Sequence, residues 1–147
     1  MKKIEITQDE LSYELEEEIK TLRTNLLFCG DDKKAILLTS CFQGEGKTNT
    51  ALQLAQSLAA MQKKVLLVDA DLRKSVLISR LNVGKVEYGL SHFLSGQCSL
   101  GEAVVSTNIP RFHIMFSGPS VKSSAELLTN ERFEKMMDSF REIYDYI

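Results

Sequence analysis

The hydrophobic pattern of this chain alternates between short apolar runs and longer stripes with helical spacing. Continuous apolar runs at residues 35–38, 65–68 and 112–116 have the length of buried strands. Apolar stripes that repeat every three or four residues precede the first run and follow the first and third runs. Strands that alternate with helices predict an α/β domain with a mainly parallel sheet flanked by helices.

The first helical stripe lies near the N-terminus and predicts a helix over about residues 7–29. Residues 7–10 have the form of a capping box, and a glycine followed by two aspartates at 30–32 ends the pattern. Within about 80° of arc, the stripe gathers Leu11, Leu15, Ile19, Leu22 and Leu26. Beside it, at three-residue spacing, lie charged side chains that we expect to be exposed: Glu17, Lys20 and Arg23. On pattern alone, a solvated charged face is the favoured interpretation and an interface is the alternative.

The rest of the chain predicts smaller elements. Short helices are expected at residues 88–94 and 100–105, and a last helix is expected after Thr129, which would cap it. Residues 144–147 have the pattern of a further strand that has only begun. We therefore expect a single domain over residues 1–147, truncated so that the C-terminal part of its sheet is missing.

A glycine loop joins the first apolar run to the next helical stripe, in the order strand, loop, Lys-Thr and helix that defines a phosphate-binding loop. Gly44 and Gly46 let the backbone turn tightly with its N–H groups inward, and the N-terminus of the following helix attracts phosphate. Lys47 adds a charge for the terminal phosphates, and the Thr48 hydroxyl can ligate Mg²⁺. The expected nucleotide-binding residues are Gln43, Gly44, Glu45, Gly46, Lys47, Thr48 and Asn49.

This loop departs from the usual pattern at its first position, where Cys41 replaces a glycine. The alternative is a glycine-rich turn that is followed by Lys-Thr by coincidence. The flanking strand and helix are the context that the motif requires, so they favour the phosphate loop.

Two carboxylates follow the second apolar run. Asp69 and Asp71 stand at the carboxyl end of a predicted parallel strand, where open α/β sheets bind ligands. Residues two apart point the same way if the strand continues, so both carboxylates could face one Mg²⁺ site. The alternative is a solvated acidic strand end, which the neighbouring phosphate loop disfavours.

Composition excludes several classes of protein. The formal net charge of −2 gives no electrostatic reason to expect nucleic-acid binding. No apolar run approaches the ~20 residues that cross a bilayer, and the N-terminus lacks the apolar core of a signal peptide. Three widely spaced cysteines predict neither a disulfide framework nor a zinc site, which fits a reducing cytosol.

Several motifs in a fixed order resemble the bacterial tyrosine kinases (BY-kinases) of capsular and exopolysaccharide synthesis. The motifs occupy residues 22–26, 43–48, 65–73, 89–96, 117–119 and 125–128, and the resemblance runs from about Tyr13 to the end of the chain. It implies a P-loop fold of the MinD/ParA type, ATP or ADP with Mg²⁺, and autophosphorylation on tyrosine.

The resemblance also assigns roles to residues. Lys47 would be the phosphate-loop lysine, and Thr48 would ligate Mg²⁺. Of Asp69 and Asp71, one would help hold Mg²⁺, for which we choose Asp71, and the other would be the base for the tyrosine hydroxyl. The row of Glu17, Lys20 and Arg23 matches the family's self-association motif, with lysine in place of its first arginine.

Three departures from the family pattern bear on catalysis. The third acidic motif, an apolar strand that ends in aspartate, would begin just past Ile147, and the tyrosine-rich tail that family members phosphorylate is also absent. Residues 121–124 replace a proline-rich segment. The first two departures leave open whether this chain is active by itself.

The resemblance further implies a partner and a location. Family members of this separate-chain type are cytosolic, lie at the inner face of the plasma membrane, and are activated by the cytoplasmic tail of a membrane adaptor. They self-associate into a ring, and no nucleic acid is expected as a partner.

Two other functions remain open. A MinD/ParA-like positioning ATPase would share the fold, but it would carry a lysine where this chain has Phe42. A catalytically incomplete fragment that binds nucleotide or assembles without turning over ATP fits the missing third motif.

Overall fold

The computed structural model describes residues 2–7 and 10–147. Within them, four strands form one sheet in the order β1-β3-β4-β2. Their bounds are β1 (Lys3–Ile4), β2 (Val65–Val68), β3 (Val104–Thr107) and β4 (Phe112–Met115). The β1–β3 and β2–β4 pairs are parallel, whereas β3 and β4 are antiparallel. The sheet is therefore mixed, with two parallel pairs joined in the middle.

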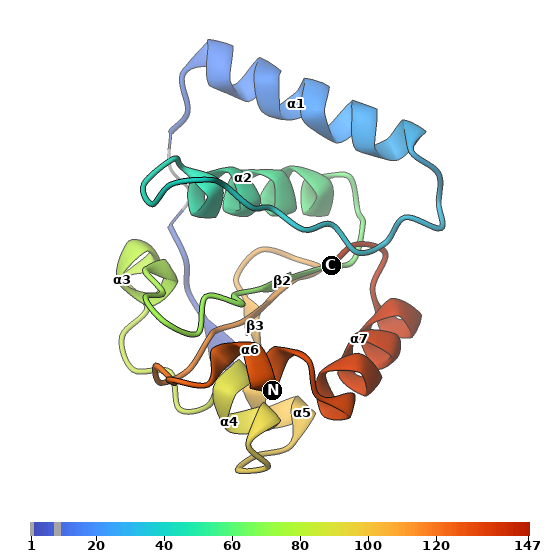
Figure 1. The fold of residues 1–147 in the computed structure, drawn as a ribbon. Helices are drawn as coiled ribbons and strands as arrows, with labels where there is room; N and C mark the ends of the chain where they lie inside the picture. Colours follow the sequence, from blue (N-terminus) through green and yellow to red (C-terminus); the bar gives the residue numbers. More distant parts are fainter. Residues whose placement is uncertain (1, 8–9) are drawn as a thin grey trace.

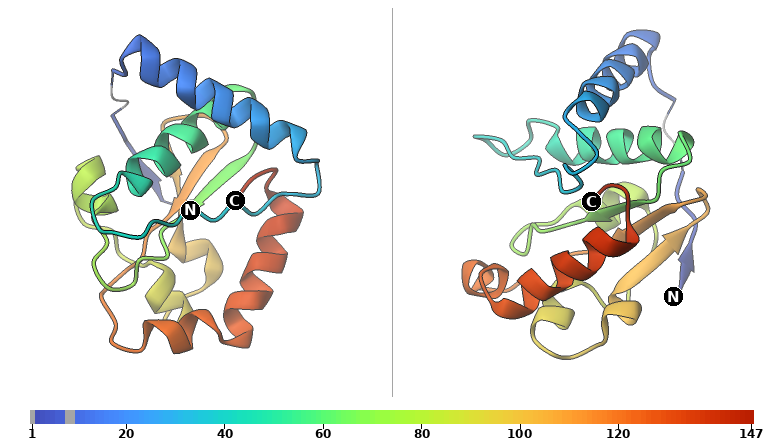
Figure 2. Two further views of the ribbon diagram at one scale, coloured as in Figure 1. Left: turned by 45° about the horizontal axis from the view of Figure 1, so that its top comes forward. Right: turned by 90° about the vertical axis from the view of Figure 1, so that its right-hand side faces the viewer.

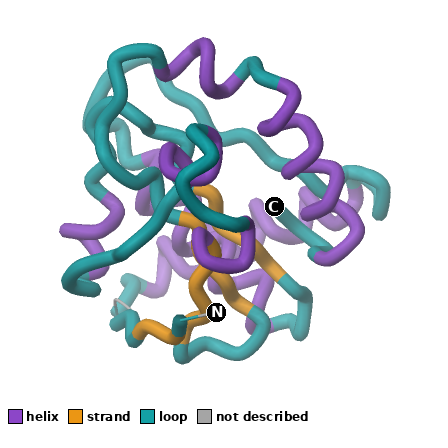
Figure 3. The backbone as a smooth tube through the Cα atoms, turned by 90° about the horizontal axis from the view of Figure 1, so that it is seen from below, coloured by secondary structure: helices purple, strands orange, loops and turns teal. Residues whose placement is uncertain are grey.

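Helices are stacked above and below this sheet (Figure 1). Their bounds are α1 (Tyr13–Phe28), α2 (Lys47–Ala60), α3 (Leu77–Leu81), α4 (Leu90–Leu94), α5 (Leu100–Ala103), α6 (Ser124–Leu128) and α7 (Glu131–Ile143). Helix α2 covers one face of the sheet, α1 lies outside α2, and α4 to α7 gather on the opposite side (Figures 1 and 2). Seen from below, helices and loops surround the strands (Figure 3).

Alternate residues of the strands divide the core into two clusters, as the two-residue period of a strand requires. Val65, Phe112 and Ile114 pack with α2 in one cluster. Leu66 and Met115, their neighbours in sequence, pack with α4 and α7 in the other. Both faces of the sheet are covered, which explains why its strands are continuous apolar runs.

The first helix begins later than the sequence predicts. Ser12 caps α1, because its hydroxyl accepts a hydrogen bond from the N–H of Leu15 at 3.3 Å. Two residues of the predicted capping box, Gln8 and Asp9, lie outside the described residues. Before these two residues, β1 pairs with β3, and the N–H of Ile6 donates to Asn108 Oδ1 at 2.9 Å. Strand β1 was not predicted.

Two other predicted elements were wrong in part. The helix expected at residues 100–105 ends at Ala103, because Val104 and the residues after it pair with β4 in the antiparallel ladder. The cap of α7 is Asn130 rather than Thr129: Asn130 Oδ1 accepts from the N–H of Phe133 at 2.9 Å, and Thr129 ends α6.

The predicted strand at residues 35–38 is not a strand in this structure. Its start touches the end of the chain, where the N–H of Ile36 donates to the Ile147 oxygen and the N–H of Ile147 donates to the Lys34 oxygen, both at 2.8 Å. Beyond this point no strand of the described residues pairs with it, and Leu37 is 85% exposed. A strand forms only against a paired neighbour, and here the neighbour covers only its first residues.

Candidate functional site

The predicted phosphate loop leads directly into α2. Gly44 and Gly46 adopt φ values of 83° and 87°, in the left-handed region that favours glycine. Gly46 is the N-cap of α2, and no side chain caps that helix end. The N-cap residue therefore supplies no side-chain cap to the first N–H groups of α2, and the positive end of the helix dipole faces the loop.

Contacts within the loop hold its shape. The N–H of Phe42 donates to Glu45 Oε2 at 3.0 Å, and the Ser40 hydroxyl donates to the Phe42 oxygen at 3.0 Å. The Glu45 carboxylate is thus turned toward its own loop. Asn49 is engaged as well, because Arg80 Nε of α3 donates to its Oδ1 at 2.8 Å.

Asp69 continues the line of β2 and is fixed on both of its carboxylate oxygens. Its N–H donates to the Met115 oxygen at 2.9 Å. Its Oδ1 accepts from the N–H of Asp71 at 3.2 Å, and its Oδ2 accepts from the Ser75 hydroxyl. The pKa of Asp69 is raised overall, mainly by burial and also by the nearby charge of Asp71. The hydrogen bonds from Ser75, Asp71 and Ser117 oppose this shift and lower the pKa.

Asp71 is more exposed than Asp69 and organises the turn that follows. Its Oδ1 accepts from the N–H groups of Arg73 at 3.2 Å and Lys74 at 3.0 Å. Within the described part of the chain, no donor contacts its Oδ2. Of the two carboxylates, Asp71 is therefore the one with an oxygen available to a ligand.

The two predicted motifs meet at one cavity of about 540 Å³. Its polar end is lined by Thr39, Lys47, Thr48, Asp69 and Asp71. The other expected nucleotide-binding residues, Gln43, Gly44, Glu45, Gly46 and Asn49, do not line it. The structure thus brings together a lysine, a helix N-terminus, a hydroxyl and two carboxylates that come from separate parts of the chain.

The rest of the cavity lining is mostly apolar. Side chains of α2 form one wall and side chains of α6 and α7 form the other: Ala51, Leu54, Ala55, Leu58, Leu128, Phe133 and Met137. Between β2 and residues 34–36, the chain end already occupies the first part of this space. The N–H of Leu66 donates to the Tyr146 oxygen at 3.0 Å, and the N–H of Tyr146 donates to the Lys64 oxygen at 3.2 Å.

The alternation of a parallel ladder identifies the backbone groups that face the remaining space. On β2 they are the oxygen of Leu66 and the N–H of Val68, one step beyond the pair used by Tyr146. On the other side they are the oxygen of Ile36 and the N–H of Leu38, one step beyond the pair used by Ile147. One further parallel strand would satisfy both rows.

The donor set of the cavity fits Mg²⁺ that is shared with a nucleotide. No three His, Cys, Asp or Glu side chains in residues 2–7 and 10–147 are grouped so that they could hold a metal ion alone. Mg²⁺ is usually held by one or two carboxylates together with water and substrate phosphates. Asp71 and Thr48 can supply such a partial set, and the uncapped start of α2 can receive the phosphates.

Two of the sequence motifs, at residues 89–96 and 117–119, had no assigned role. In the structure they pack tightly against each other near Asp69. The N–H of Ser91 donates to the Ser117 oxygen at 2.9 Å, and the Ser91 hydroxyl donates to the Pro119 oxygen at 3.0 Å. A Cβ on Gly89 would lie 2.5 Å from the backbone N of Gly118 and the same distance from the Phe116 oxygen. Only glycine allows this approach, so the junction fixes Ser117 beside Asp69. The glycines were the signal in the sequence, but their mutual contact could not be predicted.

The charged row on α1 is only partly as expected. Lys20 Nζ lies 3.0 Å from both Glu16 Oε1 and Glu17 Oε1, and Glu17 is exposed. These two carboxylates, Glu17 first, raise the pKa of Lys20. Arg23 is half-buried, and its Nη1 donates to Ser57 Oγ of α2 at 2.9 Å. The expectation that all three side chains are exposed was therefore wrong for Arg23, because it faces the neighbouring helix.

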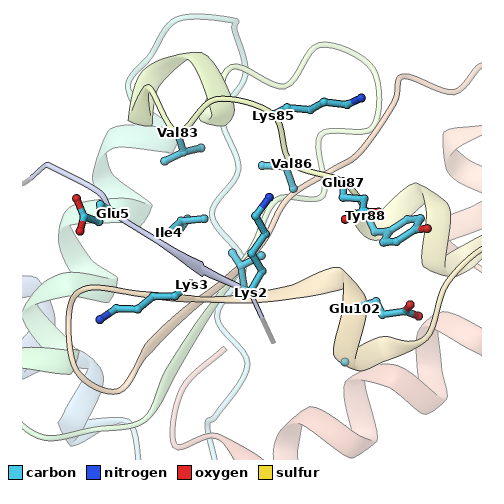
Figure 4. A pocket seen from close by; sticks show the side chains of 12 residues that line it. Lys2, Lys3, Ile4, Glu5, Val83, Lys85, Val86, Glu87, Tyr88 and Glu102 are labelled. Carbon is cyan, nitrogen blue, oxygen red and sulfur yellow. The ribbon is translucent and has the colours of Figure 1, made fainter.

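A second cavity, of about 460 Å³, lies beside β1 (Figure 4). It shares no lining residue with the first cavity. Ile4, Val83, Val86 and Val105 contribute apolar surface to it. Its charged residues have both signs, with Lys2, Lys3 and Lys85 against Glu5, Glu87 and Glu102. It contains none of the predicted site residues, and its mixed charge selects no ligand class.

Comparison with known proteins places the chain in a family. A family model described as an AAA domain matches residues 33–147. The chain belongs to the AAA-domain family. It is 38% identical to the tyrosine-protein kinase CpsD of Streptococcus agalactiae over 149 aligned residues, which cover 100% of this chain and 65% of that protein. The resemblance to bacterial tyrosine kinases is thereby confirmed, and the chain spans just under two thirds of the length of this relative.

Solved structures agree with the fold prediction. The kinase domain of the Escherichia coli tyrosine kinase ETK superposes with a TM-score of 0.83 at 28% identity, covering 89% of this chain and 52% of that one. The septum site-determining protein MinD of Pyrococcus horikoshii, complexed with Mg-ADP, gives a TM-score of 0.65 at 27% identity, covering 78% and 46%. The P-loop fold of the MinD/ParA type is confirmed, and of these two structures the kinase has the higher TM-score.

None of the helices in residues 2–7 and 10–147 combines the length and the apolar character that a membrane span requires.

Proposed function

We propose that this chain carries the Mg-ATP-binding part of a protein-tyrosine kinase that regulates capsular or exopolysaccharide synthesis and export. The observation that supports this most is the single cavity at which Lys47, Thr48, Asp69 and Asp71 meet. The curated relative CpsD, a tyrosine-protein kinase by name, matches along the whole chain.

In this proposal the surroundings of each residue indicate its role. The glycine loop and the start of α2 bind the phosphates, and Lys47 neutralises charge on the terminal ones. Thr48 and the open oxygen of Asp71 would hold Mg²⁺, which would supply positive charge to neutralise the phosphates. Asp69 takes the proton of the tyrosine hydroxyl. Its burial and raised pKa support that role, because a general base works best with a pKa near the operating pH.

The nucleotide part of the proposal is tested by calorimetry with Mg-ADP and Mg-ATP. Lys47→Ala should weaken binding by on the order of 1.5–3 kcal/mol, because a charge-assisted contact is lost. Lys135→Ala is the matched control, since Lys135 is an exposed lysine of α7 that pairs with Glu131. Equal affinity in wild type and Lys47→Ala would remove the basis of the proposal.

A second candidate function is a fragment that binds nucleotide or assembles but does not catalyse. The backbone groups of Leu66, Val68, Ile36 and Leu38 that face the cavity favour it, because no strand of the described residues pairs with them. ATP consumption would exclude this candidate. Phosphotyrosine formation then separates a kinase from a MinD-like ATPase, which would consume ATP without phosphorylating tyrosine.

For partners, we infer from the family resemblance that the full-length protein forms a ring and binds the cytoplasmic tail of a membrane adaptor. It would then act in the cytoplasm at the inner face of the plasma membrane. The outer surface of α1 supports self-association, because Leu15 and Leu22 remain 46% and 37% exposed. Seven residues apart, these two side chains lie on one face of the helix, and adjoining apolar side chains at a surface are the kind of patch that marks a protein contact.

A further inference from the structure

Apolar packing alone does not hold α1 firmly in place. Among its sixteen residues, all of which are described, Ile19 is the only fully buried one. Leu26 and Leu27 are partly buried against the core, whereas Tyr13 and Phe28 are 75% and 85% exposed. A helix with so narrow an apolar contact can roll about its axis unless a directional contact fixes its rotation.

One polar contact between α1 and α2 has that directionality. Arg23 Nη1 donates to Ser57 Oγ at 2.9 Å and to the Ser57 backbone oxygen at 3.4 Å. The Nε of Arg23 is buried and has no acceptor, and no carboxylate in the described part of the chain forms an ion pair with this side chain. The planar guanidinium is therefore oriented by Ser57, not by a neighbouring charge.

Helix geometry explains why Arg23 differs from Glu17 and Lys20 in its surroundings. Each three-residue step turns the chain by about 300°, so Arg23 lies about 120° around the axis from Glu17. When Arg23 faces Ser57, Glu17 and Lys20 are turned toward solvent, where they pair with each other at 3.0 Å. The rotation of α1 thus decides which of the three charges is presented outward. Figure 2 shows α1 crossing over α2 at an angle.

We propose that Ser57 is the positioning residue of α1, which holds Arg23 and thereby fixes Glu17 and Lys20 as the charges that face a second copy of the chain. The Arg23–Ser57 contact belongs to the interior of each copy. The link to assembly rests on the self-association proposed above, whereas the positioning itself is a property of the single chain.

Hydrogen exchange of the 147-residue chain tests the positioning. Ser57→Ala should speed exchange across α1 about fivefold, as expected for one lost hydrogen bond, and leave the buried residues of α2 unchanged. Ser57→Thr keeps the hydroxyl and should behave like wild type. Ser139→Ala is the control, because Ser139 of α7 donates only to the Lys135 oxygen of its own helix.

A double-mutant cycle separates this contact from a general loss of stability. Arg23→Ala and Ser57→Ala together should speed α1 exchange no more than either change alone, because both remove the same contact. Additive effects, or α1 exchange that does not respond to Ser57→Ala, would overturn the proposal.

Light scattering on a longer chain that self-associates tests the link to assembly. Ser57→Ala should weaken association, and Ser57→Thr should not. If α1 exchange responds while the mass does not, the presentation of Glu17 and Lys20 to a second copy is overturned. If replacing Glu17 and Lys20 also leaves the mass unchanged, the proposed self-association through α1 is what has failed.

Discussion

Ile36 and Ile147 are joined by a backbone hydrogen bond of 2.8 Å, although more than one hundred residues separate them in the sequence. Ile147 in turn follows Tyr146, which is bonded to Leu66 of β2 at 3.0 Å. The end of the chain therefore lies between the segment that leads to the phosphate loop and the strand that leads to Asp69. The phosphate loop and the Asp69 end of β2 therefore both depend on the chain segment that lies between them.

This arrangement predicts how activity depends on the neighbouring strand. Residues 1–147 alone should show little or no kinase activity, because phosphoryl transfer requires a complete and positioned metal site. A longer chain that supplies a parallel strand beside Leu66, Val68, Ile36 and Leu38 should be active. The measurement is phosphotyrosine formation with Mg-ATP, with Lys47→Ala in the longer chain as the control. Robust phosphotyrosine on the 147-residue chain would contradict this prediction.

The charged residues of α1 predict how a longer chain self-associates. Replacing Glu17, Lys20 and Arg23 together by alanine should shift it toward monomer, because Glu17 and Lys20 are the outward charges that fix the orientation of a neighbouring subunit and Arg23 holds α1 in place. Since Arg23 contacts Ser57, the pair Glu17→Ala/Lys20→Ala should retain most of this effect without loosening α1. The check is light scattering at equal protein and salt concentration; an unchanged mass would mean that these residues form only a solvated face.

The contact between His113 and Tyr144 predicts how stability depends on pH. Nδ1 of His113 lies 2.7 Å from the Tyr144 hydroxyl. Burial raises the pKa of Tyr144 to about 12, so this hydroxyl keeps its proton and donates to a neutral His113. Burial first, and then Lys64, lower the pKa of His113 below its ordinary value of 6.5. Because the folded pKa is the lower one, this contribution to stability is present above pH 6.5 and is lost as pH falls through the folded value.

Urea unfolding of wild type and His113→Gln at pH 7.5 and pH 5 would test this dependence, with both conditions chosen at about one unit or more from the ordinary pKa. Wild type should lose more stability than the variant on acidification, because glutamine does not titrate. The carboxylates titrate in both proteins, so the difference between them isolates His113. Equal losses in the two proteins would refute the assignment.

The close contact between Gly89 and Gly118 predicts that any side chain at position 89 lowers the stability of the protein. Gly89→Ala should destabilise the protein by about 1–3 kcal/mol, because its Cβ would press on backbone atoms that cannot move away. Gly101→Ala is the matched control, since a Cβ there meets nothing within 4 Å and alanine favours the helix. Chemical denaturation should show opposite signs for the two variants; equal effects would argue against a tight junction.

The candidate site could be predicted from the sequence because its signals are local. Gly44, Gly46, Lys47 and Thr48 are close neighbours, and their conformation follows from glycine geometry and the start of a helix. Asp69 and Asp71 follow an apolar run that had the length and composition of a strand. That both motifs meet at one cavity was expected, because parallel strands bring their carboxyl ends to one edge of a sheet.

The sequence by itself thus determined the phosphate loop, the acidic pair and most of the helices, since each depends on contacts within a few residues. The tertiary structure decided the features that depend on distant partners. Residues 35–38 are apolar enough for a strand but lack a paired neighbour along most of their length. Arg23 carries a charge that its own helix would leave in solvent, yet Ser57, thirty-four residues away, turns it inward. Hydrogen bonds between distant segments select one of several conformations that local preference allows. The local sequence pattern does not show which distant segment will supply the partner.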